Sequence, residues 1–321
     1  MKGRLYIDGV DAYTRYRISV ANGGYSGLAA LPPLKKVEAI DWHEEDGVDV
    51  DLSAPALDTF ELQVKFTSQG DMGVLLATLS DGAYHEFDFK EVERVCRLRL
   101  ASQASFKTLG GLHEFTLQLA NDFPLDGYAY AAPQSALALP PAGYEIDYVD
   151  LSAYGVTVLM GSLAGVVKLP PVKKNLLRSV STSSGALYDS GNVTFQQKDV
   201  TLKCLMQAAT IAELWRNRDA LLFDLSRPEK RTLYARALNE EYQCYYKSSA
   251  VERFAATGKI WLAFSLTLVI TSFKDDAILL ADNKFSVITT SDGKLIELSE
   301  TLLADKQGIF IATNKGNLIE I

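Results

Sequence analysis

Two stretches of this chain share one pattern of tyrosine, glycine, proline and lysine, about 138 positions apart. The anchor is a pair of strings, LPPLKK at residues 31–36 and LPPVKK at residues 169–174. Upstream of these strings the matched pairs are Tyr16 with Tyr154, Gly23 with Gly161, and Gly27 with Gly165. Chance alternation of apolar residues does not keep glycines and a Pro-Pro pair collinear, so the pattern indicates one fold written twice.

Further matches continue downstream with small changes of offset, as loop insertions produce. FELQVKF, residues 60–66, lies over VTLKCLM, residues 200–206. Phe87-Asp88-Phe89 lies over Phe223-Asp224-Leu225, and Cys96 over Cys244. We expect these pairs to be structurally equivalent, and both cysteines to be core residues.

The length of 321 residues favours more than one domain, since a typical domain has about 150. Residues 128–143, YAYAAPQSALALPPAG, are rich in Ala and Pro without periodicity, which is typical of an extended linker. The sequence therefore predicts a first domain over 1–127, a linker over 128–143, and a second domain over 144–273.

Strands dominate both halves, because many segments alternate polar and apolar residues. Examples are LYIDGV, FELQVKF and HEFTLQLA in the first half and VTLKCLM and IWLAFSLTLVI in the second. One short helix interrupts the strands in each half, near 73–80 and near 211–220, and Thr210 with Glu213 forms a capping box for the second. The predicted fold is mainly β (α+β), with two tandem, duplicated small β-barrels that each carry one short helix.

The C-terminal segment, 274–321, carries a second and smaller duplication. ITTSDGKLIEL, residues 288–298, matches IATNKGNLIEI, residues 311–321, and each has a turn glycine between alternating apolar residues. This predicts a pair of β-hairpins. Hairpins of this size bury little surface alone, so we expect them to pack on the second domain or on another subunit.

Composition excludes several classes of function. The net charge of −8 gives no basic surface for gripping nucleic acid. No apolar run is long enough for a membrane span, and no secretion signal is expected. Three widely spaced cysteines form neither a disulfide framework nor a metal knuckle, which favours a reducing compartment.

Motifs for catalysis, cofactors and metals are not found in the sequence, which shows no nucleophile elbow, phosphate-binding loop or dinucleotide fingerprint. The three histidines, His43, His85 and His113, all lie in the first half and read as ordinary strand residues. We therefore expect no enzyme activity, no cofactor and no metal site.

One concentration of charge stands out between residues 41 and 51. Its spacing matches no calcium loop, and the second half has Ser and Thr in place of the acids, so we interpret it as a solvated face. The acidic residues are Asp41, Glu44, Glu45, Asp46, Asp49 and Asp51.

Tandem small β-barrels, each with one helix and a Gly- and Pro-punctuated loop after the first strands, resemble the tail-tube fold of bacteriophage tails. Distal tail proteins and baseplate hubs share that fold. The resemblance covers residues 1 to about 273 and implies a structural protein of a phage or prophage tail, assembled in the bacterial cytoplasm and present in the virion. It further implies a homo-oligomeric ring, a trimer or a hexamer, that meets other tail or baseplate proteins and lets DNA pass. In such a ring, the acidic segment 41–51 would face the lumen.

A second hypothesis is a non-catalytic module that binds a carbohydrate or another ligand. Aromatic side chains could supply stacking surfaces, and the candidates are Tyr25, Tyr128, Tyr130, Tyr242, Tyr245 and Tyr246. A deep pocket inside each barrel would favour this reading, whereas barrels filled by their own side chains would favour assembly.

Overall fold

The computed structural model describes residues 2–70, 72–173, 181–182, 184–186 and 193–271, and the pairs 278–279 and 297–298. The chain divides into two compact units, residues 1–272 and 273–321. In the second unit, β17 (Ile278–Leu279) pairs antiparallel with β18 (Glu297–Leu298). The rest of the predicted hairpin pair, 274–321, lies outside the described residues and stays a prediction.

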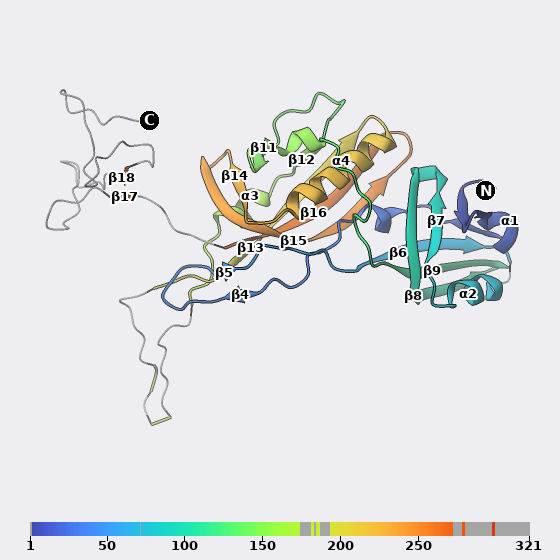
Figure 1. Cartoon of the computed structure of the whole chain (residues 1–321), viewed down its shortest axis with the longest axis horizontal. Helices are drawn as coiled ribbons and strands as arrows, with labels where there is room; N and C mark the ends of the chain where they lie inside the picture. Colours follow the sequence, from blue (N-terminus) through green and yellow to red (C-terminus); the bar gives the residue numbers. More distant parts are fainter. Residues whose placement is uncertain are drawn as a thin grey trace. The chain divides into compact units, whose positions relative to one another are not determined.

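The larger unit holds two antiparallel sheets, each of seven strands in the described residues (Figure 1). The strands of the first sheet are β1 (Leu5–Ile7), β2 (Val10–Asp11), β3 (Ile18–Val20), β6 (Phe60–Ser68), β7 (His85–Phe89), β8 (Arg94–Leu109) and β9 (Leu112–Asn121). Those of the second are β10 (Tyr144–Ile146), β11 (Val149–Asp150), β12 (Val156–Val158), β13 (Lys198–Ala208), β14 (Arg231–Ala235), β15 (Glu240–Ala255) and β16 (Ile260–Ile270). The mainly β fold class is thereby confirmed.

The strand order is the same in both sheets. The first runs β2-β1-β7-β8-β9-β6-β3, and the second runs β11-β10-β14-β15-β16-β13-β12. When strands are matched by their rank along the chain, every neighbour in one sheet has its counterpart in the other. The domain limits at 127, 143 and 273 stay predictions.

Hydrogen bonds at the start of the two sheets match residue for residue. Asp8, with φ 49°, accepts from the Glu86 N–H at 2.9 Å. Asp147, with φ 48°, accepts from the Thr232 N–H at 2.9 Å. Aspartate is among the few residues that tolerate this left-handed backbone region. β1 and its counterpart β10 therefore end in turns of the same kind.

The long hairpins β8–β9 and β15–β16 carry a bulge at the same place. Pairing shifts between Leu100 and Ser102 in β8 and between Tyr246 and Ser248 in β15. A bulge inserts one unpaired residue and bends its strand, so it marks a register position. It makes Leu100 of β8 the counterpart of Tyr246 in β15.

The sequence predicts that each sheet closes into a barrel, and this part of the prediction is wrong. Among the described residues, β2 and β3 are the end strands of the first sheet, and they do not pair with each other. They are joined by the short helix α1 (Ala12–Tyr16), and in the second sheet η3 (Leu151–Tyr154) joins β11 to β12. A connection of about six residues cannot span far, so each sheet curls until its two ends lie near one another.

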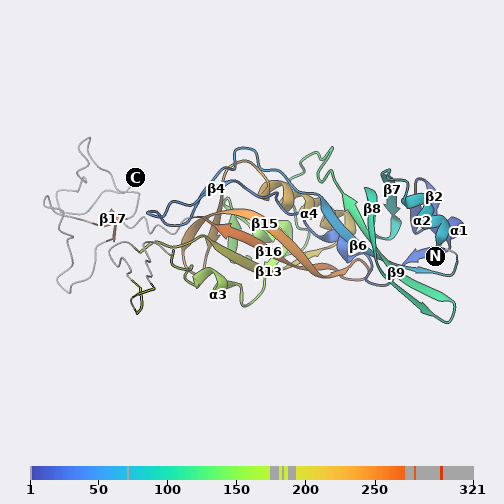
Figure 2. The same ribbon diagram turned by 90° about the horizontal axis from the view of Figure 1, so that it is seen from below.

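Both predicted helices are present, each between the fourth and fifth strands, in chain order, of its seven-stranded sheet. The first is α2 (Gly73–Leu79), and the second is α4 (Ile211–Leu225), which runs further than the predicted end at 220. Figures 1 and 2 show α4 lying across one face of the second sheet. Shorter helical turns are η1 (Ser26–Ala29), η2 (Lys90–Val92) and α3 (Ser162–Val167).

At the start of α4, one of the two hydrogen bonds of the predicted capping box is confirmed. The Glu213 N–H donates to Thr210 Oγ1 at 3.1 Å. The Glu213 carboxylate, however, accepts from the Ala209 N–H at 3.1 Å and from the Ala136 N–H at 2.8 Å. Residues 128–143 contain no helix or strand, and Glu213 holds them against α4.

Two sequence matches are wrong. Phe87–Phe89 belongs to β7, whose counterpart is β14, whereas Phe223–Leu225 lies in the last turn of α4. The offset changes because α4 has 15 residues and α2 has 7.

The cysteine match fails for the same reason. Cys244 pairs with Arg231 as Leu98 pairs with His85, so the counterpart of Cys244 is Leu98 rather than Cys96. Cys244 is buried as expected, whereas Cys96 is only partly buried.

Candidate functional site

Between β3 and β6 the first half extends a long arm. It begins after the LPPLKK string, narrows to a hairpin of β4 (Ala39–Ile40) and β5 (Asp49–Val50), and returns to β6. An isolated bridge joins Leu34 to Leu57 at its base, and the second half has a bridge between Val172 and Phe195 at the same place. The repeated Pro-Pro strings thus mark the base of two equivalent loops.

The tip of the first arm lies on the second half (Figure 2). The Gly47 N–H donates to Phe195 O at 2.8 Å, and the Val48 N–H donates to Thr271 O at 3.0 Å. The Thr194 hydroxyl donates to His43 O at 2.8 Å. The arm therefore joins the two halves through backbone groups as well as side chains.

Lys173 is the main anchor of the arm tip. Its ammonium donates to Trp42 O at 2.6 Å and to Glu45 O at 2.7 Å, and it lies 2.6 Å from Asp41 Oδ1. The side chain is buried, so these three acceptors replace the water that the charge has lost. Its counterpart in the first half is Lys35, which is exposed.

The structure places the six predicted acidic residues on or beside this one hairpin, where they have different interaction partners. Asp41 pairs with Lys173, Asp46 accepts from the Phe195 N–H at 2.8 Å, and Asp51 accepts from Ser53. Hydrogen bonds from Ser53 hold the pKa of Asp51 below its usual value. Glu44, Glu45 and Asp49 are exposed.

Closer to the sheets, a buried charge cluster links the two halves. Asp219 of α4 accepts from Arg94 Nη1 at 2.7 Å and from Arg218 Nη1 at 2.5 Å. Burial by itself would raise the pKa of Asp219, but the two guanidinium groups outweigh burial and hold it below its usual value. The Arg94 guanidinium also lies over the Trp215 ring, 4.9 Å from its centre, and the Trp215 indole donates to Val92 O at 2.5 Å.

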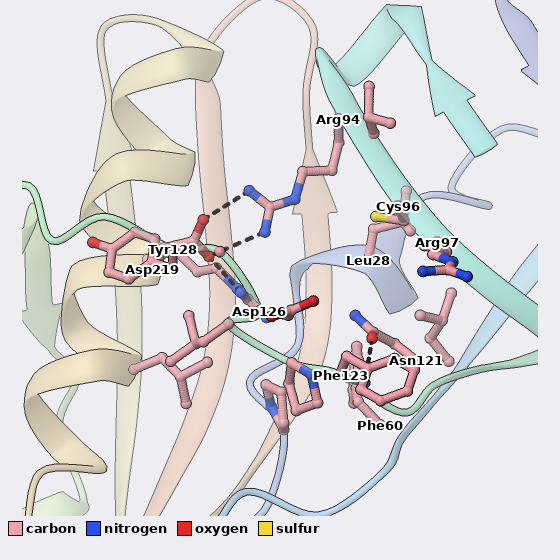
Figure 3. A pocket seen from close by; sticks show the side chains of 18 residues that line it. Leu28, Phe60, Arg94, Cys96, Arg97, Asn121, Phe123, Asp126, Tyr128 and Asp219 are labelled. Carbon is pink, nitrogen blue, oxygen red and sulfur yellow. Dashed lines mark hydrogen bonds and ion pairs between the residues drawn. The ribbon is translucent and has the colours of Figure 1, made fainter. Parts of the chain in front are cut away.

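A cavity of about 320 Å³ lies beside this cluster, between β8, α4 and the start of the linker (Figure 3). Its size is at the low end for a ligand pocket. Of the charged residues at its wall, Arg94, Arg218 and Asp219 are paired with one another, and Arg97 and Asp126 also line it. The cavity thus lies between the halves rather than inside either sheet.

Side chains fill the curled interior of each sheet. Phe66, Phe87, Phe115 and Leu117 are fully buried in the first half, and the second half buries Val200, Leu202, Leu233, Leu266 and Leu268 in the same way. This packing favours assembly over the ligand-binding alternative.

The candidate stacking tyrosines do not form one surface. Tyr25 donates to Glu91 and meets Phe89 edge-on, and Tyr246 donates to Pro32 O at 2.9 Å. Tyr128 and Tyr130 both pack on Phe223 of α4. Tyr242 donates to Glu240, and Tyr245 is partly buried. Tyr246 thus contacts the Pro-Pro segment, and Tyr128 and Tyr130 hold the linker against α4.

The histidines are also separated, with His85 on β7, His113 on β9 and His43 at the arm tip. His85 lies 2.7 Å from Asp8 and 3.2 Å from Asp81. In the described part of the chain, no group of three or more His, Cys, Asp or Glu residues is placed to hold a metal ion. No helix among the described residues has the length and apolar character to cross a membrane.

Comparisons with known proteins find similarity among solved structures but not among family models or curated proteins. No family model matches the sequence, and no curated protein matches it. Among solved structures, the chain is similar to the SPP1 Dit (gp 19.1) protein, described as a paradigm of the hub adsorption apparatus in phages that infect Gram-positive bacteria. The identity is 13%, the TM-score is 0.30, and the match covers 83% of this chain and 98% of that one. A TM-score of 0.30 is too low to decide the function.

Sequence reasoning missed the residues that join the halves. Lys173 stands in the repeated string LPPVKK, where it looks equivalent to Lys35. Arg94, Arg218 and Asp219 carry no spacing signal, because Arg94 lies in β8 and the other two lie in α4. These elements are far apart in the sequence, and only the tertiary structure brings them together.

Proposed function

We propose that this chain is a structural component of a phage or prophage tail or baseplate, forming a ring that continues the tail tube and lets DNA pass. The observation that carries the proposal is the contact between its halves. The two sheets share one strand order, and the arm and Pro-Pro segment of the first half lie on a different surface of the second half. A contact of this kind uses two different surfaces, so it can be repeated between chains until a ring closes.

The ring would be a homo-oligomer, a trimer that supplies six sheets or a hexamer. Closure would also cover strand edges that otherwise invite aggregation. The proposal assigns the chain no catalytic step and no cofactor. Its place is the virion tail, next to other tail or baseplate proteins, after assembly in the bacterial cytoplasm.

The exposed acids of the arm tip, Glu44, Glu45 and Asp49, would face the lumen in this ring. Negative charge repels the phosphate backbone, so DNA would slide past rather than bind. The duplicated halves and the net charge of −8 both fit a conduit.

Absolute mass by light scattering over a concentration series, followed by negative-stain imaging, tests the ring. We expect a species of three or six chains with a central hole. A Glu44→Cys variant labelled with nanogold then locates the acidic segment, with label expected in the hole. Label on the outer rim would contradict the lumen assignment, and a strict monomer at all concentrations would contradict the ring.

A further inference from the structure

One segment of the fold occurs twice in this chain, in two different environments. In the first half this segment is η1, which follows β3, and in the second half it is α3, which follows β12. Residues that point to their own sheet are buried in both places, since Leu28 is 4% exposed and its counterpart Val166 is 1% exposed. The cores beneath the two segments are therefore alike.

Residues on the outer side of the segment differ sharply. Leu31 is 3% exposed, whereas its counterpart Leu169 is 75% exposed. Ala29 is 1% exposed, whereas Val167 is 56% exposed. Among the described residues, the first copy of the segment is covered by other residues on both sides, and the second copy is covered on one side.

The second half supplies the cover for the first copy. The Leu31 N–H donates to Ser249 Oγ at 3.0 Å, and Tyr246 donates to Pro32 O at 2.9 Å. One step further, the Leu34 N–H donates to Lys247 O at 3.0 Å. Residues 31–34 thus lie along β15 at its bulge.

Within the described residues, the second copy presents a group of exposed apolar side chains, which we name the α3 patch. Leu163 and Val167 lie four residues apart in α3 and so share one face, and Met160 and Leu169 lie just before and just after the helix. The members of the patch are Leu159, Met160, Leu163, Val167 and Leu169. Exposed apolar patches of this kind mark interaction sites.

The α3 patch is held in place from beneath. The buried Lys198 ammonium donates to Val166 O at 2.6 Å and to Lys168 O at 2.7 Å, which are carbonyls at the end of α3. At the other end, Ser162 Oγ donates to Leu159 O at 2.9 Å and accepts from the Lys203 N–H at 2.9 Å. A partner would therefore meet a preformed surface.

The matching receiver is exposed on the first half. Within the described residues, β7 pairs with β8 only over Arg94–Leu98, so the rest of that β8 edge has no strand beside it. Residues 101–108 of β8 are all exposed. The shared bulge makes Ala101 the counterpart of Lys247 and Gln103 the counterpart of Ser249.

We infer that the α3 patch of one chain docks on the β8 edge of a second copy of the chain, around Ala101–Gln103. The contact between the halves of one chain is the template for it, with Leu169 meeting Gln103 as Leu31 meets Ser249. This inference rests on the proposed ring and names the surfaces that close it. Each chain carries one patch and one edge, so the contact propagates in one direction.

The contact between chains is weaker than its template. In the template, α4 adds Arg218, whose Nε donates to Ala29 O at 3.4 Å and whose Nη2 donates to Ala30 O. The seven-residue α2 offers no such arginine on the receiving side. We therefore expect assembly to depend on protein concentration.

Disulfide trapping between two variants tests the contact. A Leu169→Cys chain is mixed with a Gln103→Cys chain under mild oxidation, and we expect a covalent dimer that contains one chain of each kind. A Leu169→Cys chain mixed with a Val74→Cys chain is the matched control, since Val74 is exposed on α2, and it should give no dimer. Absence of the mixed dimer at concentrations where the wild type is assembled would overturn the inference.

A Leu169→Asp variant provides the second measurement. Because Leu169 is exposed in the single chain, the variant should fold normally and need roughly tenfold or more protein for half-assembly. Rings that persist in Leu169→Asp and give no mixed dimer would reject this contact and leave the ring proposal standing. A mixed dimer with open filaments instead of rings would support the contact and reject the ring. Protection of Leu169→Cys from maleimide in the monomer would mean that the chain's own residues 273–321 cover the patch, which also overturns the inference.

Discussion

The first and second halves of this chain have the same strand order, yet they bury different residues. In the first half the Pro-Pro segment, the arm and Arg94 all lie against the second half, whereas in the second half Val167 and Leu169, the counterparts of the buried Ala29 and Leu31, are exposed. The difference shows that position in the chain, and not the fold alone, decides which residues are core. Four comparisons test this asymmetry.

The largest effect is expected at the charge cluster. Replacing Asp219 with alanine leaves Arg94 and the buried Arg218 without their carboxylate, and we expect a loss of about 3–5 kcal/mol in the free energy of unfolding. Chemical denaturation measures it. The control is Asp199→Ala, which breaks an exposed pair with Lys247 and should cost at most about 1 kcal/mol. Equal losses in the two variants would contradict the role of the cluster.

A second comparison uses the two matched lysines. Lys173→Met removes a buried ammonium and leaves the Trp42 and Glu45 carbonyls without it, so we expect a loss of about 2–3 kcal/mol in the stability of the arm tip. Amide hydrogen exchange at Gly47 and Val48 reports it directly. Lys35→Met, at the exposed counterpart, should leave both amides protected. Unchanged exchange in Lys173→Met would show that the backbone bonds alone hold the tip.

The third comparison concerns two matched glycines. A Cβ at Gly27 would lie 2.5 Å from Gln63 O, so Gly27→Ala forces η1 away from β6 and should cost about 1–3 kcal/mol. At Gly165, within α3, a Cβ meets nothing within 4 Å. There the substitution should be neutral or stabilise by about 0.5–1 kcal/mol. Thermal unfolding of the pair decides it, and a shift of the same sign in both would refute the difference.

The smallest effect is a difference in pH dependence between His85 and its counterpart Arg231. Burial lowers the pKa of His85, but Asp8 and Asp81 outweigh it and the pKa is raised. The stabilising contribution of His85 is therefore complete below its ordinary pKa of about 6.5 and is lost as the pH rises through the raised value. Its counterpart Arg231 is paired with Asp147 at 2.7 Å, and guanidinium groups in general do not titrate between pH 5 and 8. Unfolding measured from pH 5 to 8 should show this loss in the wild type and not in His85→Arg.

The sequence predicts the regular parts of the fold well. Alternation identified the strands, and the helix near 73–80 is found at Gly73–Leu79 because its apolar residues and flanking polar residues are local signals. The strings LPPLKK and LPPVKK mark equivalent bridges, since Pro-Pro fixes the backbone wherever it stands. These features depend on neighbours in the chain.

Features that depend on distant residues were not predictable. The match of Cys96 with Cys244 is wrong because α4 is longer than α2, which shifts the offset between the halves before β14. The predicted barrel closure is wrong because pairing between the two end strands depends on the six-residue connection through α1. Lys173 and Lys35 look alike in sequence, and only the docked arm makes one of them buried. The position of the acidic segment relative to a lumen stays a prediction.

The docked arm also has a consequence for the order of folding during synthesis. The first sheet is complete once β9 has been made, but the arm tip needs Thr271, at the end of β16. Ribosomes add about 5–20 residues per second, so the 150 residues from the end of β9 at Asn121 to Thr271 take roughly 8–30 s to make. During that interval the first sheet of the nascent chain is folded, but its acidic hairpin has not yet docked. The hairpin docks only when the second sheet is nearly complete. Docking of the arm is thus the last step in the folding of the larger unit.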